Sequence, residues 1–412
     1  MPTVLLIGTL DTKGAETAYL RERVRAHGCD TLILDSGILR EADGITADYD
    51  RATVAHAAGT TIETLRAIGT RGAAVEQMLK GVRAIALDLH AQGRIQGAAA
   101  LGGAEGSVLA AAAMTALPIG FPKLIVSPIA SGHRRFGPFV GTRDVLVMHS
   151  VVDILGLNPI SMAVFDGAAA AIAGMARAYA DRPPLLRDTL TVAATMLGNT
   201  TRPLMFIRQF AEEMTGCDMV IFHANGVGGR AMEEQIAAGA VEIVLDYTLS
   251  EIPGHLFGGF HDGGADRLLA AGRAGIPQVI VPGCLDFIVF GARHEVPDKY
   301  ADRLTYYHNP EFTLVRLTLE EQLQAVDVVV DKLNQSASPV TVIMPTRGIS
   351  IMDNADGGVF WDESISLARR ERFRQGLRAE IDYQEIDAHI NETPFANVVL
   401  KAVIAAINTI QR

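Results

Sequence analysis

The chain has little cysteine and no long uninterrupted apolar segment. Its 412 residues include three cysteines and no CxxC pair. So few thiols cannot form a disulfide framework, which favours a reducing, cytoplasmic setting. No apolar stretch reaches the length of a transmembrane helix without an interrupting glycine, proline or charge. The sequence opens directly on a strand-like segment, so we expect neither a secretory leader nor a membrane span.

Basic runs and standard motifs are also absent. The 36 Lys and Arg residues are outnumbered by 47 Asp and Glu residues, which gives a net charge of −11. This balance argues against non-specific binding to nucleic acid or to a membrane. It leaves room for a small anion, because a cluster of backbone N–H groups binds anions even in an acidic protein. No Walker A, GxGxxG, HExxH, DxDxDG or Cys/His spacing occurs, so the pattern predicts no dedicated metal site.

What the sequence does contain is a recurring loop. Five times an apolar run ends in a glycine-containing turn that a helical segment follows. A buried strand that turns through glycines into a helix offers free N–H groups and a positive helix end. Five such turns, several with Thr, Ser, Lys or Arg, favour a protein organised around phosphates or carboxylates. They lie at 4–16, 97–110, 190–201, 219–234 and 341–353.

Short apolar runs alternate with helical segments along the whole chain, which predicts an α/β fold. The charged, proline-containing stretch from Tyr179 to Thr189 separates two halves. We therefore expect two Rossmann-like domains, 1–182 and 183–412, each with a mainly parallel, doubly wound sheet. The expected strands are 3–7, 30–35, 97–101, 122–126 and 145–148 in the first half, and 189–196, 219–223, 240–245, 278–282 and 340–344 in the second.

The first loop, GTLDTKGAE, offers hydroxyls and charges directly after a strand. A capped turn would explain the aspartate and the threonines, but a cap does not need a lysine, so we favour contact with a ligand. The candidate residues here are Gly8, Thr9, Asp11, Thr12 and Lys13.

The second loop, LGGAEGS, has glycines that permit a tight turn and close approach of a ligand. Close packing of helix on sheet explains them equally well. The candidates are Gly102, Gly103, Gly106 and Ser107. A third segment, from Ile125 to Asp144, is long, glycine-rich and basic, as binding loops often are, and it adds Ser127 and Arg134.

Polar residues also follow the strands of the second half. If those strands lie side by side, their polar ends converge in one crevice, the usual design of an α/β active site. The alternative is a set of separate caps and turns. The candidate catalytic residues are His223, Arg230, Asp246, Glu251, Asp286 and Arg347.

Several of these segments occur together in a known order. GTLDTKGAE, LGGAEGS, GVGGRAMEE, VLDYTLSEI and HNPEFTLVR resemble the family of the tomato mosaic virus resistance protein, whose bacterial members are uncharacterised. The resemblance covers nearly the whole chain. It implies an N-terminal ATP-binding domain, a second α/β domain of unassigned role, and a homo-oligomer, in the first instance a dimer.

Two functions remain open at this point. In one, ATP lies with magnesium on the N-terminal loops, and the protein is an enzyme that acts on a small carboxylate or sugar-acid metabolite in the C-terminal crevice. In the other, it is a nucleotide-regulated binding protein without chemistry of its own.

Overall fold

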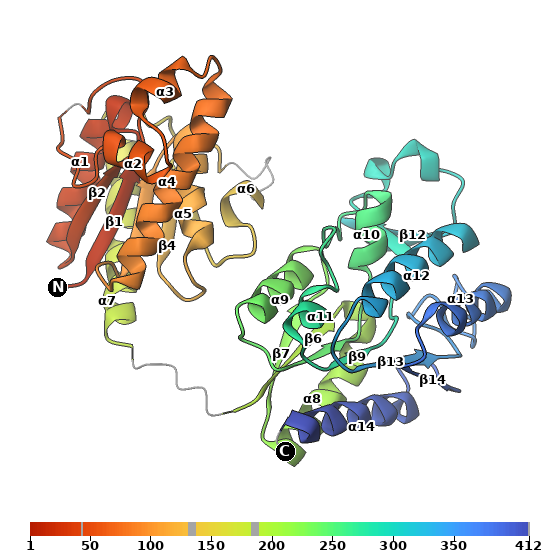
Figure 1. Cartoon of the computed structure of the whole chain (residues 1–412). Helices are drawn as coiled ribbons and strands as arrows, with labels where there is room; N and C mark the ends of the chain where they lie inside the picture. Colours follow the sequence, from red (N-terminus) through yellow and green to blue (C-terminus); the bar gives the residue numbers. More distant parts are fainter. Residues whose placement is uncertain (43, 131–136, 183–188, 411–412) are drawn as a thin grey trace. The chain divides into compact units, whose positions relative to one another are not determined.

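The computed structural model describes residues 1–42, 44–130, 137–182 and 189–410. The chain divides into two compact units, Met1–Leu185 and Leu186–Arg412 (Figure 1). The boundary expected after residue 182 adjoins residues 183–188, which lie outside the described residues. Each unit is built around its own parallel sheet.

The first unit holds a five-stranded parallel sheet in the order β2-β1-β3-β4-β5. Its strands are β1 (Thr3–Gly8), β2 (Asp30–Asp35), β3 (Gly97–Leu101), β4 (Lys123–Ser127) and β5 (Leu146–His149). The chain runs outward in one direction from β1 to β2 and in the other from β3 to β5. The winding direction of the sheet therefore changes between β1 and β3. Doubly wound folds have a crevice for ligands at this point.

Both faces of this sheet are covered because both alternate sets of strand residues are apolar. Val4 and Leu6 pack among residues of α1 and α7, whereas Leu5 and Ile7 pack among residues of α2 to α5. The helices are α1 (Leu10–Ala26), α2 (Arg51–Ala57), α3 (Ile62–Ala67), α4 (Arg71–Ala91), α5 (Ala104–Ala116), α6 (Gly137–Val140) and α7 (Pro159–Ala180).

The second unit repeats the same strand order with one more strand, β14-β13-β9-β8-β6-β7. The strands are β6 (Thr191–Met196), β7 (Asp218–His223), β8 (Ile243–Asp246), β9 (Gln278–Ile280), β13 (Val340–Pro345) and β14 (Asp382–Ile386). In chain order both sheets read second, first, third, fourth, fifth. All described pairings in both sheets are parallel.

Helices also cover both faces of the second sheet. α8 and α14 lie against each other on one face, where Val192 and Ala194 join their core (Figure 1). The other face carries α9 to α13 in two clusters. The helices are α8 (Thr201–Thr215), α9 (Val227–Ala237), α10 (Glu251–Phe257), α11 (Ala270–Ala274), α12 (Leu319–Asn334), α13 (Glu363–Gly376) and α14 (Thr393–Ile410).

The sequence pattern missed the edge strand β14, as well as a three-stranded antiparallel sheet. It pairs β10 (Phe287–Phe290) with β12 (Phe312–Arg316), and β12 with β11 (Thr305–Asn309). The segment was expected to supply polar site residues but no strands. Its alternation is clear only in retrospect: Phe287, Val289 and Leu314 face one cluster, and Ile288, Phe290 and Val315 face another.

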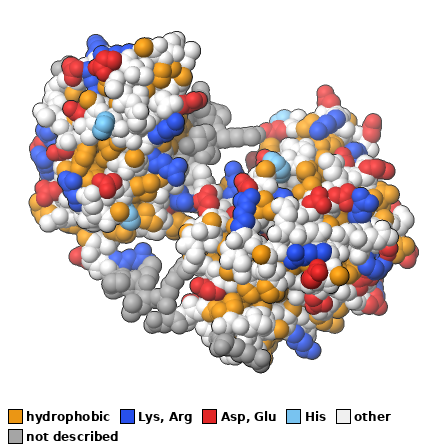
Figure 2. All heavy atoms as spheres, viewed as in Figure 1, with side chains coloured by type: hydrophobic (Ala, Val, Ile, Leu, Met, Phe, Trp, Pro, Cys, Tyr) orange, Lys and Arg blue, Asp and Glu red, His pale blue; other side chains and the backbone are white. Residues whose placement is uncertain are grey.

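The expected α/β architecture with two mainly parallel sheets is confirmed. Two helices, α7 and α14, are apolar and long enough to cross a bilayer by length and composition. Each packs one face on its sheet through residues such as Phe165 and Val399. On the face in Figure 2, acidic and basic side chains are interspersed over both units, so neither sign forms a broad field there.

Two helical glycines of the first unit differ in the space around them. A Cβ on Gly81 in α4 would lie 2.0 Å from the carbonyl oxygen of Val54, whereas one on Gly174 in α7 would meet nothing within 4 Å. We expect Gly81→Ala to destabilise the unit by about 1–3 kcal/mol through overpacking. Gly174→Ala should stabilise it by about 0.5–1 kcal/mol, because alanine loses less backbone entropy. Urea denaturation followed by circular dichroism measures both; equal effects would contradict the packing.

Candidate functional sites

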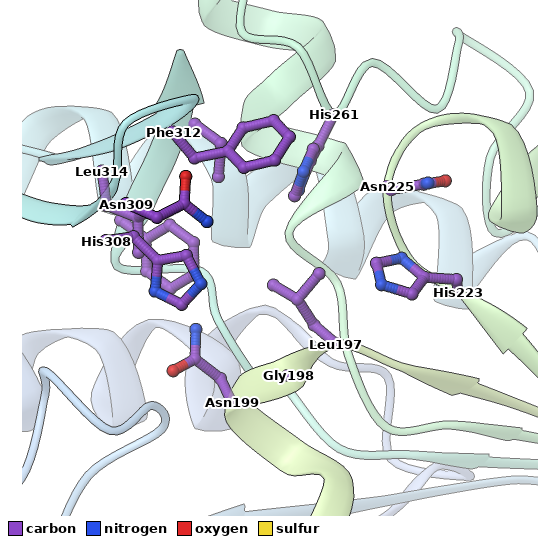
Figure 3. Close-up of a pocket in the computed structure, with 12 residues that line it drawn as sticks. Leu197, Gly198, Asn199, His223, Asn225, His261, His308, Asn309, Phe312 and Leu314 are labelled. Atoms are coloured by element: carbon purple, nitrogen blue, oxygen red, sulfur yellow. The ribbon is translucent and has the colours of Figure 1, made fainter. Parts of the chain in front are cut away.

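A pocket in the second unit lies at the carboxyl ends of β6 and β7, beside the small antiparallel sheet (Figure 3). Its volume is about 410 Å³. Three histidines and three asparagines supply its polar groups, and five apolar side chains and Gly198 complete the wall. The lining residues are Leu197, Gly198, Asn199, His223, Asn225, His261, Phe287, Val289, His308, Asn309, Phe312 and Leu314.

A β-bulge brings His308 and Asn309 to the same pocket. Tyr307 pairs with Thr313 and Asn309 pairs with Phe312, so His308 is one extra residue in β11. In a regular strand two consecutive side chains point to opposite faces. The bulge breaks this alternation, a common way to redirect side chains beside a site.

Two glycines hold the backbone of His261 in place. A Cβ on Gly254 would lie 2.0 Å from the His261 carbonyl oxygen, and one on Gly226 would lie 3.1 Å from its carbonyl carbon. The side chain is 9% exposed, and its ring points toward the cavity in Figure 3. Burial, together with nearby His223, lowers the pKa of His261 from 6.5 to about 4. The imidazole is therefore neutral at physiological pH.

The asparagines are partly engaged by the protein itself. The side-chain oxygen of Asn225 accepts hydrogen bonds from the backbone N–H groups of Val227 and Gly228, at 3.3 and 3.2 Å. Its amide NH₂ remains as a donor. The backbone carbonyl of Asn199 accepts a 2.9 Å hydrogen bond from Asn391 Nδ2, which ties the loop after β6 to the start of α14.

Behind this pocket lies a buried ion-pair network centred on Arg267. Its guanidinium donates to both oxygens of Asp246, at 2.5 and 2.7 Å, and its Nε donates to Glu251 at 2.7 Å. A third carboxylate, Glu233, accepts at 3.2 Å. The residues Arg267, Asp246 and Glu251 are at most 1% exposed. Asp246 and Glu251 therefore face the protein interior and not the pocket.

The glycine-rich start of α9 receives one of these carboxylates. Glu251 Oε1 accepts hydrogen bonds from the backbone N–H groups of Gly226 and Gly229, at 2.6 and 3.0 Å. A Cβ on Gly229 would lie 1.8 Å from the other oxygen of Glu251. The glycines thus permit close approach of an internal anion. Arg230, expected to bind a ligand's carboxylate or phosphate, donates instead to the Gly226 carbonyl at 2.8 Å.

Asp286 and Arg347 lie in two further places. Asp286 is 1% exposed and accepts a 2.7 Å hydrogen bond from Ser350, and burial together with Asp353 raises its pKa to about 7. Arg347 pairs with Asp356 at 2.6 Å and lines a separate cavity with Trp361. Of the six side chains expected to share one crevice, only His223 lines the pocket. The others satisfy buried partners or lie elsewhere, and a catalytic role for them stays a prediction.

A second pocket, of about 570 Å³, lies in the first unit. It is formed by the loops after β1, β2 and β3, at the point where the winding direction changes. The lining residues are Thr9, Asp11, Thr12, Lys13, Gly37, Ile38, Leu39, Arg71, Gly103, Ala104, Glu105 and Gly106.

The two expected N-terminal loops therefore meet. Six of the expected residues line this pocket: Thr9, Asp11, Thr12, Lys13, Gly103 and Gly106. Two of them also form hydrogen bonds to backbone groups of the protein. Asp11, 7% exposed, accepts from the backbone N–H of Leu39 at 3.1 Å, and the Lys13 ammonium donates to the carbonyl of Ile154.

The other expected residues that the structure describes in this unit do not line the pocket. Ser107 is fully buried; its hydroxyl donates to the carbonyl of Gly102 at 2.9 Å and lies 2.8 Å from the hydroxyl of Ser127, so its single proton is already used within the protein. A Cβ on Gly102 would lie 2.7 Å from the backbone of Gly106, and one on Gly8 would lie 2.8 Å from Thr17. These glycines serve close packing. Arg134 lies outside the described residues.

Sequence reasoning missed several lining residues. Arg71, at the start of α4, lines the pocket of the first unit and forms an ion pair there with Glu105, 34 positions away in the chain. In the second unit His261 and Asn199 line the pocket, but neither is among the site residues expected from the sequence. No local signal marked them, although the glycine pairs around His261 indicated close backbone packing.

Comparison with known proteins gives a family for the whole chain. Residues 2–181 and 189–407 match the N-terminal and C-terminal domains of an uncharacterised protein family, UPF0261. The chain belongs to UPF0261. It is 36% identical to a UPF0261 protein of Clostridium tetani, over 97% of this chain and 98% of the relative. It is also 31% identical to the ToMV resistance protein Tm-1 of Solanum lycopersicum, over 98% of this chain but 55% of that protein. The expected resemblance is confirmed.

Solved structures resemble this UPF0261 chain only distantly. A UDP-GlcNAc 2-epimerase from Neisseria meningitidis is 11% identical with a TM-score of 0.23, over 68% of this chain and 82% of that one. A Streptomyces glycosyltransferase, SsfS6, is 12% identical with a TM-score of 0.17, over 98% and 99%. Similarity at this level does not extend to function.

The ion-pair network predicts a strong dependence of the second unit on Arg267. In Arg267→Met three carboxylates lose their buried cation, and we expect the unit to lose about 3–5 kcal/mol of stability. The single tryptophan, Trp361, lies in this unit, so its fluorescence during urea denaturation reports the loss. Arg273→Met is the matched control, because that side chain is exposed at 66%. Equal stability of both variants would contradict the network.

Asp286 predicts an unusual pH dependence of stability. The native state keeps its proton up to about pH 7, whereas an unfolded aspartate loses it near 3.8. Between these values the native state binds more protons, so this group's contribution to stability falls as pH rises, by a few kcal/mol in total. When urea denaturation is repeated between pH 4.5 and 8, the free energy of unfolding of Asp286→Asn should fall less with rising pH than that of the unaltered chain. An unchanged slope would show that the carboxyl ionises normally in the fold.

Proposed function

We propose that the first unit binds the phosphates of a nucleotide, ATP in the first instance, in the pocket between the loops after β1 and β3. The observation that carries the proposal is the start of α5, which opens into this pocket without a capping side chain. Gly103 is the N-cap residue of α5 and lines the pocket. The 13-residue helix then begins with Ala104, Glu105 and Gly106. First-turn N–H groups have no intrahelical partner, and the helix end is positive, so the geometry favours a phosphate.

The rest of the pocket supports the same ligand. The hydroxyls of Thr9 and Thr12 lie 3.2 Å apart at its edge, and Lys13 and Arg71 bring positive charge. Ile38 and Leu39 supply an apolar part of the wall beside this polar end. A nucleotide has the same division into a charged phosphate chain and a flat, less polar base.

Magnesium follows from the carboxylates of the pocket. Asp11 and Glu105 both line it, and either one would repel a phosphate chain. A hard divalent cation between carboxylate and phosphates removes this repulsion and prefers oxygen ligands of both kinds. We therefore propose that ATP binds as its magnesium complex.

The second unit's pocket supports an additional role as a small-molecule site, with His223 as the group placed for acid–base work. In this view the protein is an enzyme. The alternative, a nucleotide-regulated binding protein, predicts that ATP is bound but not consumed. Slow ATP turnover that rises with one added metabolite would favour the enzyme.

Calorimetric titration with ATP, with and without magnesium, tests the nucleotide site in variants of Gly103. Nothing lies within 4 Å of a Cβ at this position, so Gly103→Ala should keep both fold and affinity. Gly103→Asp places a carboxylate where it caps the α5 N–H groups and repels phosphate. We expect the aspartate variant to remain folded and to bind magnesium-ATP at least about tenfold more weakly, a loss of about 1.4 kcal/mol.

Two results would contradict the proposal. One is the absence of ATP binding to the unaltered protein, and the other is equal affinity of the alanine and aspartate variants. Arg71→Ala, compared with Lys80→Ala on the same helix, then separates a contact with the phosphates from a general loss of positive charge, because Lys80 does not line the pocket.

A further inference from the structure

The pocket of the second unit differs from the nucleotide site in its charge. None of its twelve lining residues is Lys, Arg, Asp or Glu. Of the three carboxylates expected there, Asp246 and Glu251 are turned inward to Arg267, and Asp286 is buried against Ser350. A carboxylate or phosphate placed in this pocket would have no fixed counter-ion, and desolvating an unpaired charge is costly.

His261 gives the pocket an unmet hydrogen-bonding group. Its Nδ1 is buried and has no hydrogen-bond partner among the described residues. Buried polar atoms of native proteins are nearly always paired, and exceptions call for an explanation such as a missing ligand. The packing of Gly226 and Gly254 against its backbone fixes the point from which this side chain leaves the main chain.

The asparagines of the pocket carry no charge, and an amide side chain both donates and accepts hydrogen bonds. Asn199 offers an NH₂ donor and a carbonyl acceptor. Asn309 offers its NH₂, while its side-chain oxygen already accepts from the Glu311 backbone N–H at 2.9 Å. The neutral imidazole of His261 offers one donor and one acceptor. The opposite wall is apolar, with Phe287, Phe312 and Leu314 from one face of the small sheet. Hydroxyl groups, which donate and accept, match the first wall, and C–H groups match the second.

We propose that this pocket binds a small uncharged molecule rich in hydroxyl groups, of the size of a monosaccharide, with His261 as its innermost hydrogen-bonding contact. The inference rests on the proposed small-molecule role of this unit and assigns its ligand class: neutral polyols, in place of the carboxylates and sugar acids expected from the sequence. It is independent of the nucleotide site.

The test measures binding of matched probes to the full chain. The probes are glucose, galactose and mannose, each beside its uronic acid, and binding is followed by saturation-transfer NMR and by the thermal unfolding monitored through Trp361. We expect a neutral sugar to bind and its acid to bind at least tenfold more weakly. Binding of the acids alone, or of no probe at high millimolar concentration, would overturn the proposal.

Variants show whether binding uses the named residues. His261→Phe should weaken binding at least tenfold without lowering the unfolding temperature, because it removes an unpaired buried atom and keeps the ring. A purely structural histidine would instead give lower stability with unchanged affinity, which would overturn the role of His261. His308→Ala, at an exposed bulge, should weaken binding to a similar extent and serves if His261→Phe does not fold. His294→Phe lies outside the pocket and is the control.

ATP titrations of the same samples separate the two proposals. His261→Phe and His308→Ala should bind magnesium-ATP as the unaltered chain does, and Gly103→Asp should bind the sugar normally. If the unaltered chain binds magnesium-ATP but no sugar, only the polyol site is overturned; if it binds a sugar but not magnesium-ATP, only the nucleotide site is overturned.

Discussion

The buried guanidinium of Arg267 is the interaction on which the second unit depends. It neutralises carboxylates from three elements: Asp246 at the end of β8, Glu251 at the start of α10, and Glu233 in α9. Each carboxylate also accepts hydrogen bonds from other groups, including backbone N–H groups of Gly226, Gly229 and Leu268. One cation and several oriented N–H groups thus hold three negative charges out of water, at a cost that only good geometry offsets.

This network determines the shape of the neighbouring pocket. Glu251 fixes the start of α9, and close packing of Gly228 on the carbonyl of His223 fixes how that helix meets the end of β7. The same helix α10 that carries Glu251 packs through Gly254 against His261. The positions of His223 and His261 therefore follow from buried contacts that do not themselves line the pocket. Burial at this position keeps the imidazole of His261 neutral.

The two units share a strand order but differ in their sites. In the first unit a helix start without a side-chain cap opens into a cavity with both cations and carboxylates. In the second unit the equivalent kind of helix start, that of α9, is closed by the protein's own Glu251. The same local sequence design, glycines between strand and helix, thus gives an uncapped helix start beside a cavity in one unit and an internal ion pair in the other.

The local pattern of the sequence determined the two sheets. β2 and β3 begin and end where expected, at Asp30–Asp35 and Gly97–Leu101, because strands covered on both faces are short, continuously apolar runs bounded by turns. The antiparallel strands β10 to β12 and the edge strand β14 were missed. β14, DYQEI, has no apolar run, and the bulge at His308 breaks the alternation of β11.

The sequence by itself also predicted that the loops carrying Thr9, Lys13 and Gly103 lie in one sheet, and these residues line one pocket because loops after neighbouring parallel strands meet at one sheet edge. Only the tertiary structure decided which polar residues face a cavity and which face each other. Asp246 and His223 both end strands of one sheet, yet one is paired with Arg267 and the other lines the pocket. The distinction depends on Arg267, 21 residues beyond Asp246, and on glycines whose missing Cβ atoms let buried charges approach. Composition and spacing carry no record of such long-range pairing.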